Sequence, residues 1–115
     1  MKELISVIVP AFNAEKYIIT ALQSVLDQTY SNIEVIVIND GSTDGTEGLV
    51  QTLQKSDSRI KLYSIENRGR AGARNYGIEQ SKGTWLAFLD ADDFWYLNKL
   101  EMQYEKYEAD NTVGL

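Results

Sequence analysis

Three aspartates, Asp90, Asp92 and Asp93, stand close together directly after an apolar run over residues 85–89. In an extended chain the side chains alternate between faces, so Asp90 and Asp92 would share one face and Asp93 would point away. Two carboxylates on one face repel each other unless a cation lies with them. Mg²⁺ and Mn²⁺ prefer oxygen ligands, and diphosphate oxygens often complete their coordination. The spacing predicts a divalent metal site on Asp92 and Asp90; the alternative is a solvated turn in which Asp93 caps the next helix.

Asp40 has a similar place after the apolar run 33–38, inside the segment Asn39–Asp44. Its carboxylate could accept a hydrogen bond from an N–H group of a base or from a ribose hydroxyl. The same composition is typical of any tight turn between a strand and a helix. Composition alone favours the plain turn.

Arginines bring positive charge to the segment after the run 60–65, at Arg68, Arg70 and Arg74. Arg70 and Arg74 are four residues apart and share one face of a predicted helix, where a guanidinium fork could bind a diphosphate. For Arg70 we favour the alternative, an ion pair with Glu66 or Glu79. Arg74 is expected to reach a phosphate only if its helix begins at the ligand cleft.

The segment Pro10–Glu15 leaves the first apolar run with two further polar candidates. Asn13 and Glu15 could contact a nucleoside. Equally, Asn13 could cap the following helix and Glu15 could complement the dipole of that helix. Among the aromatic residues, Trp95 is the one placed for contact with a sugar or an acceptor.

Composition restricts the chemistry further. The 115 residues are the size of one domain, with a net charge of −6 and no block of like charge, so general affinity for nucleic acid or an anionic membrane is not expected. The chain contains no Cys and no His, which excludes disulfides, thiol nucleophiles, Ser-His-Asp triads and the usual zinc sites. Neither a signal peptide nor a membrane span is evident, so we expect a cytoplasmic protein, and a peripheral membrane association of the full-length protein stays open.

Strands and helices are expected to alternate and to position these residues. The apolar run over residues 4–9 predicts a strand buried on both faces, residues 33–38 repeat that pattern, and two further strands are predicted at residues 60–65 and 85–89. Helical spacing predicts helices from Asn13 to about Asp27, around residues 49–53, over residues 70–80, and from Leu97 to about Asp110. Pro10 is expected to stop the first strand, and residues 112–115 would begin a fifth strand or form a frayed tail.

This alternation predicts an α/β fold, an open and mainly parallel Rossmann-like sheet with helices on both faces. In such sheets ligands bind beyond the carboxyl ends of the strands. The loops expected at the ligand are therefore residues 10–13, 39–45, 66–74 and 90–93.

Four segments, in order and at matching spacing, closely resemble the family 2 glycosyltransferases: Ser6–Glu15, Asn39–Asp44, Asn67–Asn75 and Leu89–Asp93. The resemblance covers almost the whole chain, and the four motifs together are highly specific. It implies a GT-A fold, a sugar donor activated by a nucleoside diphosphate, most often UDP, and transfer with inversion to a glycan or lipid-linked acceptor. It also implies a Mn²⁺ or Mg²⁺ ion at the Asp-x-Asp motif.

The family pattern implies donor-binding roles in all four segments: Pro10, Ala11 and Glu15 against the nucleoside, Asp40 against the base, Arg74 near the base or diphosphate, Asp90 near the ribose or a metal-bound water, and Asp92 on the metal. The chain departs from the pattern at Asn39, often an Asp in the family, and at Leu97, where a Pro is common. Neither departure removes a predicted ligand.

The family's acceptor-binding half, with its general base, lies downstream of residue 115 in this pattern. We therefore expect residues 1–115 to be the donor-binding part of a truncated domain, with no catalytic base. The alternatives are a non-catalytic α/β interaction module and a receiver-type phospho-acceptor domain. The receiver would need an acidic pair directly after the first strand, where this chain has Pro10, Ala11 and Phe12.

Overall fold

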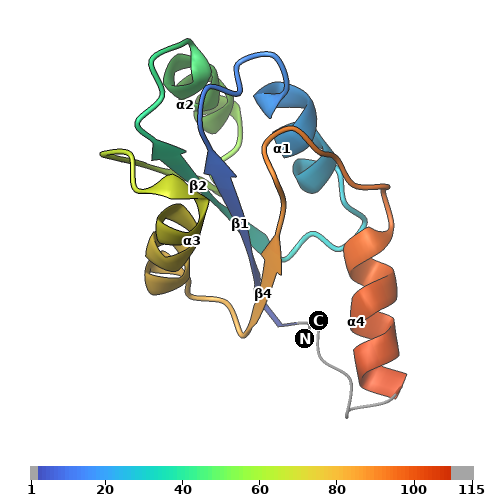
Figure 1. Ribbon diagram of the computed structural model, residues 1–115. Helices are drawn as coiled ribbons and strands as arrows, with labels where there is room; N and C mark the ends of the chain where they lie inside the picture. Colours follow the sequence, from blue (N-terminus) through green and yellow to red (C-terminus); the bar gives the residue numbers. More distant parts are fainter. Residues whose placement is uncertain (1–2, 110–115) are drawn as a thin grey trace.

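Four strands and four helices alternate along the chain in the computed structural model, which describes residues 3–109 (Figure 1). The elements are β1 (Ile5–Ala11), α1 (Ile18–Leu26), β2 (Ile33–Asp40), α2 (Thr46–Ser56), β3 (Ile60–Ile65), α3 (Gly69–Gln80), β4 (Trp85–Phe88) and α4 (Lys99–Ala109). The strands are parallel, in the order β3-β2-β1-β4. The predicted α/β fold is confirmed; the segment predicted as a fifth strand lies outside the described residues.

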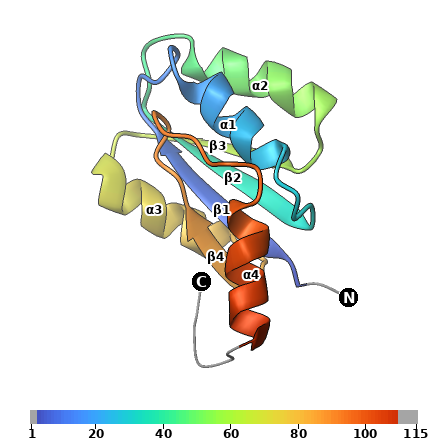
Figure 2. The same cartoon turned by 90° about the vertical axis from the view of Figure 1, so that its right-hand side faces the viewer.

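The sheet has a hydrophobic core on each face. Successive side chains of a strand point to opposite faces, and in the central strands the side chains on both faces are mostly apolar. Val7, Val9 and Val35 pack with residues of α1 and α4 in the larger core. Ile8 and Ile36 face the other way and pack with α3. Figure 2 shows α3 on one side of the sheet, with α1 and α2 on the other.

β1 continues through Pro10 to Ala11, so the prediction that Pro10 ends this strand is wrong. The backbone of Ile8 faces β4, since its carbonyl accepts a hydrogen bond from Leu89. Pro10, two residues on, faces the same side, but the ladder with β4 ends at the pair Ile8 and Phe88. The missing N–H of Pro10 therefore costs the sheet no hydrogen bond.

α4 begins at Lys99, two residues later than the sequence suggested. The buried side chain of Gln28 holds the preceding segment: its Nε2 donates to the Tyr96 carbonyl at 2.6 Å, and its Oε1 accepts from Leu100 N at 3.0 Å. Leu97, expected on the apolar face of the helix, lies in the turn before α4 and is 61% exposed; its carbonyl accepts a hydrogen bond from Thr29 N.

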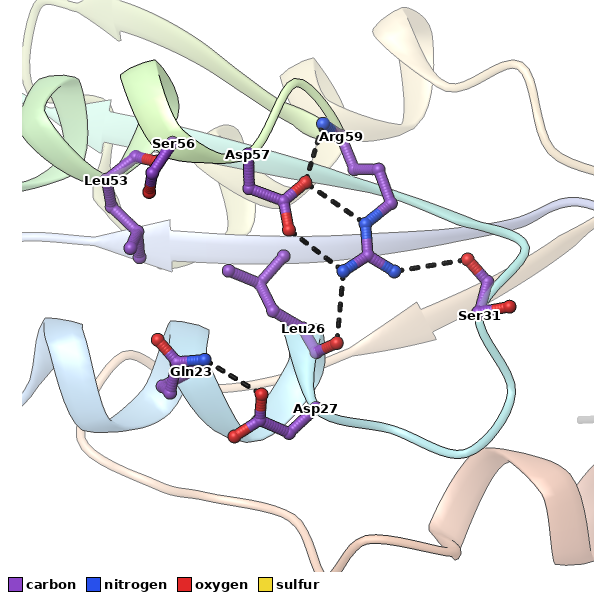
Figure 3. A network of polar contacts seen from close by, with 8 residues as sticks. All are labelled: Gln23, Leu26, Asp27, Ser31, Leu53, Ser56, Asp57 and Arg59. Carbon is purple, nitrogen blue, oxygen red and sulfur yellow. Dashed lines mark hydrogen bonds and ion pairs between the residues drawn. The ribbon is translucent and has the colours of Figure 1, made fainter.

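A polar network ties the elements together at the amino ends of the strands (Figure 3). The guanidinium of Arg59 donates to the carbonyls of Leu26 and Ser31, at 3.0 and 3.1 Å, and forms an ion pair with Asp57 at 2.9 Å. Arg59 thus joins the end of α1 to the turn before β3. This network does not involve the carboxyl ends of the strands, where a ligand is expected to bind.

Candidate functional site

A cleft of about 380 Å³ opens at the carboxyl ends of β1 and β2, beside the turn that follows β4. All four loops that the sequence predicted at the ligand contribute to its wall. The lining residues are Pro10, Ala11, Phe12, Asn13, Ala14, Tyr17, Asp40, Asn67, Gly69, Arg70, Asp90, Ala91 and Asp92. A cleft of this size suits a ligand as large as a nucleotide.

Asp90 and Asp92 both line the cleft. Their segment is a turn and not the extended chain assumed from the sequence, because Asp93 N donates to the Asp90 carbonyl at 3.0 Å. Asp93 does not cap a helix: its Oδ1 accepts from Phe94 N at 2.8 Å, and α4 begins only at Lys99. The turn sets two of the three carboxylates toward the cleft.

The donor set at this turn fits a hard divalent cation, since both side chains offer only oxygen. Among residues 3–109 no group of three or more acidic side chains is close enough to hold a metal by itself. A cation on Asp90 and Asp92 would need further ligands from water or from phosphate oxygens.

Asp40 is only 4% exposed. One of its carboxylate oxygens is hydrogen-bonded within the protein, and the other is available to a ligand. Its Oδ1 accepts from Arg68 N at 2.7 Å, and its carbonyl accepts from Asn67 Nδ2 at 3.1 Å. The next residue, Gly41, has φ +77, and a Cβ there would lie 2.9 Å from Asn67 N. Among the described residues, every fully buried side-chain oxygen or nitrogen has a hydrogen-bond partner. The second carboxylate oxygen of Asp40 has no such partner among them, so it is not fully buried. Because Asp40 lines the cleft, we infer that this oxygen faces the cleft.

The arginines are arranged differently from the sequence-based expectation. α3 does begin at the cleft, but Arg70 is the arginine that lines it. The partner of Arg70 is Asp90, with Nη1 4.0 Å from Oδ2, so the suggested pairing with Glu66 or Glu79 is wrong. Arg74 lies one helical turn farther on, where its guanidinium carbon is 5.2 Å from the centre of the Phe88 ring.

Asn13 lines the cleft in a left-handed backbone conformation, with φ 48. It does not cap α1, whose N-cap is Tyr17. Its Oδ1 instead accepts from Thr43 N at 2.8 Å, and its own N–H donates to Ser42 Oγ at 3.0 Å. These contacts fasten the loop after β1 to the loop after β2.

Glu15 lies beside Asn13 and does not line the cleft. Its Oε2 accepts from Gly45 N at 2.8 Å, and its N–H donates to Asp44 Oδ2 at 3.2 Å. Gly45 is the N-cap residue of α2, so the carboxylate complements the start of α2 and not of α1. We call the contacts of Asn13 and Glu15 with residues 42–45 the clasp.

Two aromatic side chains of the cleft were missed by the sequence reasoning. Phe12 and Tyr17 are 52% and 54% exposed and line the cleft. The prediction that Trp95 faces a sugar is wrong, because its ring is 8% exposed and packs under the Lys99 ammonium. The signal available for Phe12 was its place inside the first motif, two residues after Pro10.

Comparison with known proteins agrees with this geometry. The family model described as glycosyl transferase family 2 matches residues 6–115. The chain belongs to this family. Membership decides against the receiver domain, and the fold is that of the GT-A glycosyltransferases.

Relatives within glycosyl transferase family 2 include the Escherichia coli protein named UDP-Glc:alpha-D-GlcNAc-diphosphoundecaprenol beta-1,3-glucosyltransferase WfgD. It is 50% identical over 101 residues, which is 87% of this chain and 39% of that protein. The chain spans less than half the length of the curated relatives it matches.

Two solved structures of glycosyltransferases match almost the whole chain. S. aureus TarS 1-349 in complex with UDP gives a TM-score of 0.86 at 31% identity and covers 96% of this chain and 33% of that one. Mannosyltransferase PcManGT from Pyrobaculum calidifontis, in complex with GDP-Man and Mn²⁺, gives 0.87 at 30% identity and covers 99% and 34%. Within residues 3–109 of this family member, no helix has the length and apolarity that crossing a bilayer requires.

Proposed function

We propose that this chain binds the nucleoside diphosphate part of a sugar donor in the cleft, together with a Mn²⁺ or Mg²⁺ ion. The charge of the cleft carries this proposal. Three carboxylates, Asp40, Asp90 and Asp92, stand against one guanidinium, Arg70, which leaves a formal charge of −2. A diphosphate would be repelled by this wall, and a divalent cation held by Asp92 and Asp90 removes the repulsion.

The remaining cleft residues suit the nucleoside. The open oxygen of Asp40 can accept a hydrogen bond from a base N–H. Phe12 and Tyr17 offer exposed aromatic side chains, and Pro10 and Ala11 line the same cleft. UDP is the proposed nucleotide, since TarS is solved with UDP and WfgD is named for UDP-Glc, although PcManGT is solved with GDP-Man.

Glu15 and Arg74 belong to the proposed donor site because the family pattern implies it, and Asn13 belongs to it because of its position in the sequence and in the cleft. Asn13 can contact the nucleoside directly, because it lines the cleft. Glu15 and Arg74 do not line the cleft. Any role in donor binding would therefore act through a neighbouring residue, Gly45 for Glu15 and Phe88 for Arg74.

The proposed reaction of the whole protein is transfer of the sugar to an acceptor hydroxyl with inversion at the anomeric carbon. The cation would stabilise negative charge on the departing diphosphate. We assign residues 1–115 to donor binding and propose no general base among the described residues. A glycan or lipid-linked acceptor is proposed, in line with the diphosphoundecaprenol in the name of WfgD.

Titration calorimetry with UDP tests the proposal. We expect UDP to bind in the presence of Mn²⁺, and EDTA to weaken the binding by at least about tenfold, because the charge of the cleft is then uncompensated. Asp92→Ala should cause a similar loss. Asp93→Ala is the matched control, since Asp93 carries the same charge one residue away and does not line the cleft. Metal-independent binding of UDP, or equal effects of the two substitutions, would contradict the proposed function.

A further inference from the structure

Arg70 has a position that no other cationic side chain of the described residues shares. It is the one cationic residue in the cleft lining, and it lies in the first turn of α3. The neighbouring arginines are engaged elsewhere. The guanidinium carbon of Arg68 lies 5.6 Å from the Tyr76 ring centre, and that of Arg74 lies 5.2 Å from the Phe88 ring centre.

The Arg70 guanidinium is held loosely. Its nearest carboxylate oxygen is Asp90 Oδ2 at 4.0 Å, and the two side chains are 69% and 40% exposed. An exposed ion pair at this distance contributes little stability, because water screens the charges and the long side chain loses rotamer freedom. Arg70 can therefore leave Asp90 at small cost when another partner enters the cleft.

The same carboxylate is one of the two proposed for the divalent cation. A cation near Asp90 repels the guanidinium and competes with it for the carboxylate oxygens. It also brings the diphosphate, whose oxygens match the planar fork of arginine. The two positive charges would then lie on different sides of the same anion.

We propose that Arg70 is a donor-binding residue that contacts the diphosphate, and that Asp90 holds its guanidinium in the cleft before the cation and the nucleotide bind. The inference rests on the proposed function. Its consequence is that Arg70 opposes binding of the cation alone and favours binding of the cation with the nucleotide. Arg70 thereby makes the two binding events cooperative.

Calorimetric titrations of the whole chain with Mn²⁺ alone, with UDP in saturating Mn²⁺, and with uridine test this. For Arg70→Gln, removal of the competing charge should tighten binding of Mn²⁺ alone by about two- to fivefold. Loss of the charge-assisted contact should weaken UDP binding by about tenfold. Uridine, which has no phosphate, should bind as it does to the wild type. Arg70→Lys should restore part of the UDP affinity, since lysine supplies charge without the fork.

Arg68→Gln is the matched control. Arg68 lies two residues before Arg70 and carries the same charge, but its side chain does not line the cleft. The substitution should leave all three affinities unchanged, and circular dichroism should show that both variants remain folded. An unchanged UDP affinity in Arg70→Gln, or an equal loss for UDP and uridine, would overturn the inference while the proposed function stands. Absence of Mn²⁺-dependent UDP binding by the wild type would overturn both.

Discussion

The carboxylate of Glu15 accepts a hydrogen bond from the backbone N–H of Gly45 at 2.8 Å, although the two residues belong to loops after different strands. Behind it, Ala14 N donates to Thr46 Oγ1 at 2.9 Å. Together with those of Asn13, these contacts hold the loop after β1 against the start of α2. The lining residues Asn13 and Ala14 are therefore held in part by residues that do not line the cleft, namely Glu15, Gly45 and Thr46.

Glu15→Ala should weaken UDP binding by about three- to tenfold, because a loop that has lost its hydrogen bonds must be ordered when the ligand binds. Glu15→Gln should bind UDP nearly as well as the wild type, since an amide oxygen can still accept from Gly45 N. Calorimetry on Glu15→Ala, on Asp44→Ala and on the variant carrying both substitutions completes a double-mutant cycle with the wild type. Non-additive effects of Glu15→Ala and Asp44→Ala are expected for a shared clasp, and strict additivity would argue that Glu15 contacts the nucleoside by itself.

Gly77 lies where α3 crosses the sheet, and a Cβ built there would be 2.6 Å from Ile8 Cγ2. Ile8 is fully buried, so the strand has no room to yield. We expect Gly77→Ala to lower the free energy of unfolding by about 1–3 kcal/mol, as overpacking does. Urea denaturation measures this. In Gly48→Ala a Cβ meets nothing within 4 Å, so this helical glycine should instead gain up to about 1 kcal/mol.

Much of the fold follows from local patterns. The segment Ile33–Ile38, apolar except at Glu34, suits a strand buried on both faces, and the structure places it in one. The errors fall at the ends of elements, where distant contacts decide. Pro10 is tolerated in β1 because β4 ends early, and the start of α4 depends on Gln28, about seventy residues earlier in the chain.

The cleft was predictable as a set of loops, since the carboxyl ends of parallel strands must lie together. Individual side-chain directions were not predictable. Arg70 and Arg74 share one helical face by spacing, yet in the structure Arg70 lines the cleft and the Arg74 guanidinium lies beside the Phe88 ring. The burial of Trp95 depends likewise on packing against α1, through Trp95 N and Ser24 Oγ.

Acid should destabilise the fold partly through Asp57. The side-chain hydrogen bond from Arg59, seen in Figure 3, lowers the pKa of Asp57 below its usual 3.8. A lowered folded-state pKa means that the unfolded chain binds the proton first, so this stabilisation is complete above about pH 4 and is lost as the pH falls through the folded pKa. Asp57→Asn should be less stable near pH 6 yet lose less stability below pH 4. Urea denaturation over pH 2–7 measures both slopes, and identical slopes would show that this pair does not contribute.

Base selection should depend on the open oxygen of Asp40. In UDP the uracil N3–H is a donor that suits a carboxylate oxygen, whereas N3 of cytosine is an acceptor. In Asp40→Asn the amide oxygen can accept the hydrogen bond that Arg68 N now donates to Asp40 Oδ1, and the NH₂ group would then face the cleft. We expect UDP affinity to fall by about tenfold and CDP affinity to rise, because a buried polar site discriminates strongly against a mismatched partner. Competition calorimetry with the two nucleotides in Mn²⁺ measures the ratio. If both affinities fell together, Asp40 would be holding the turn without contacting the base.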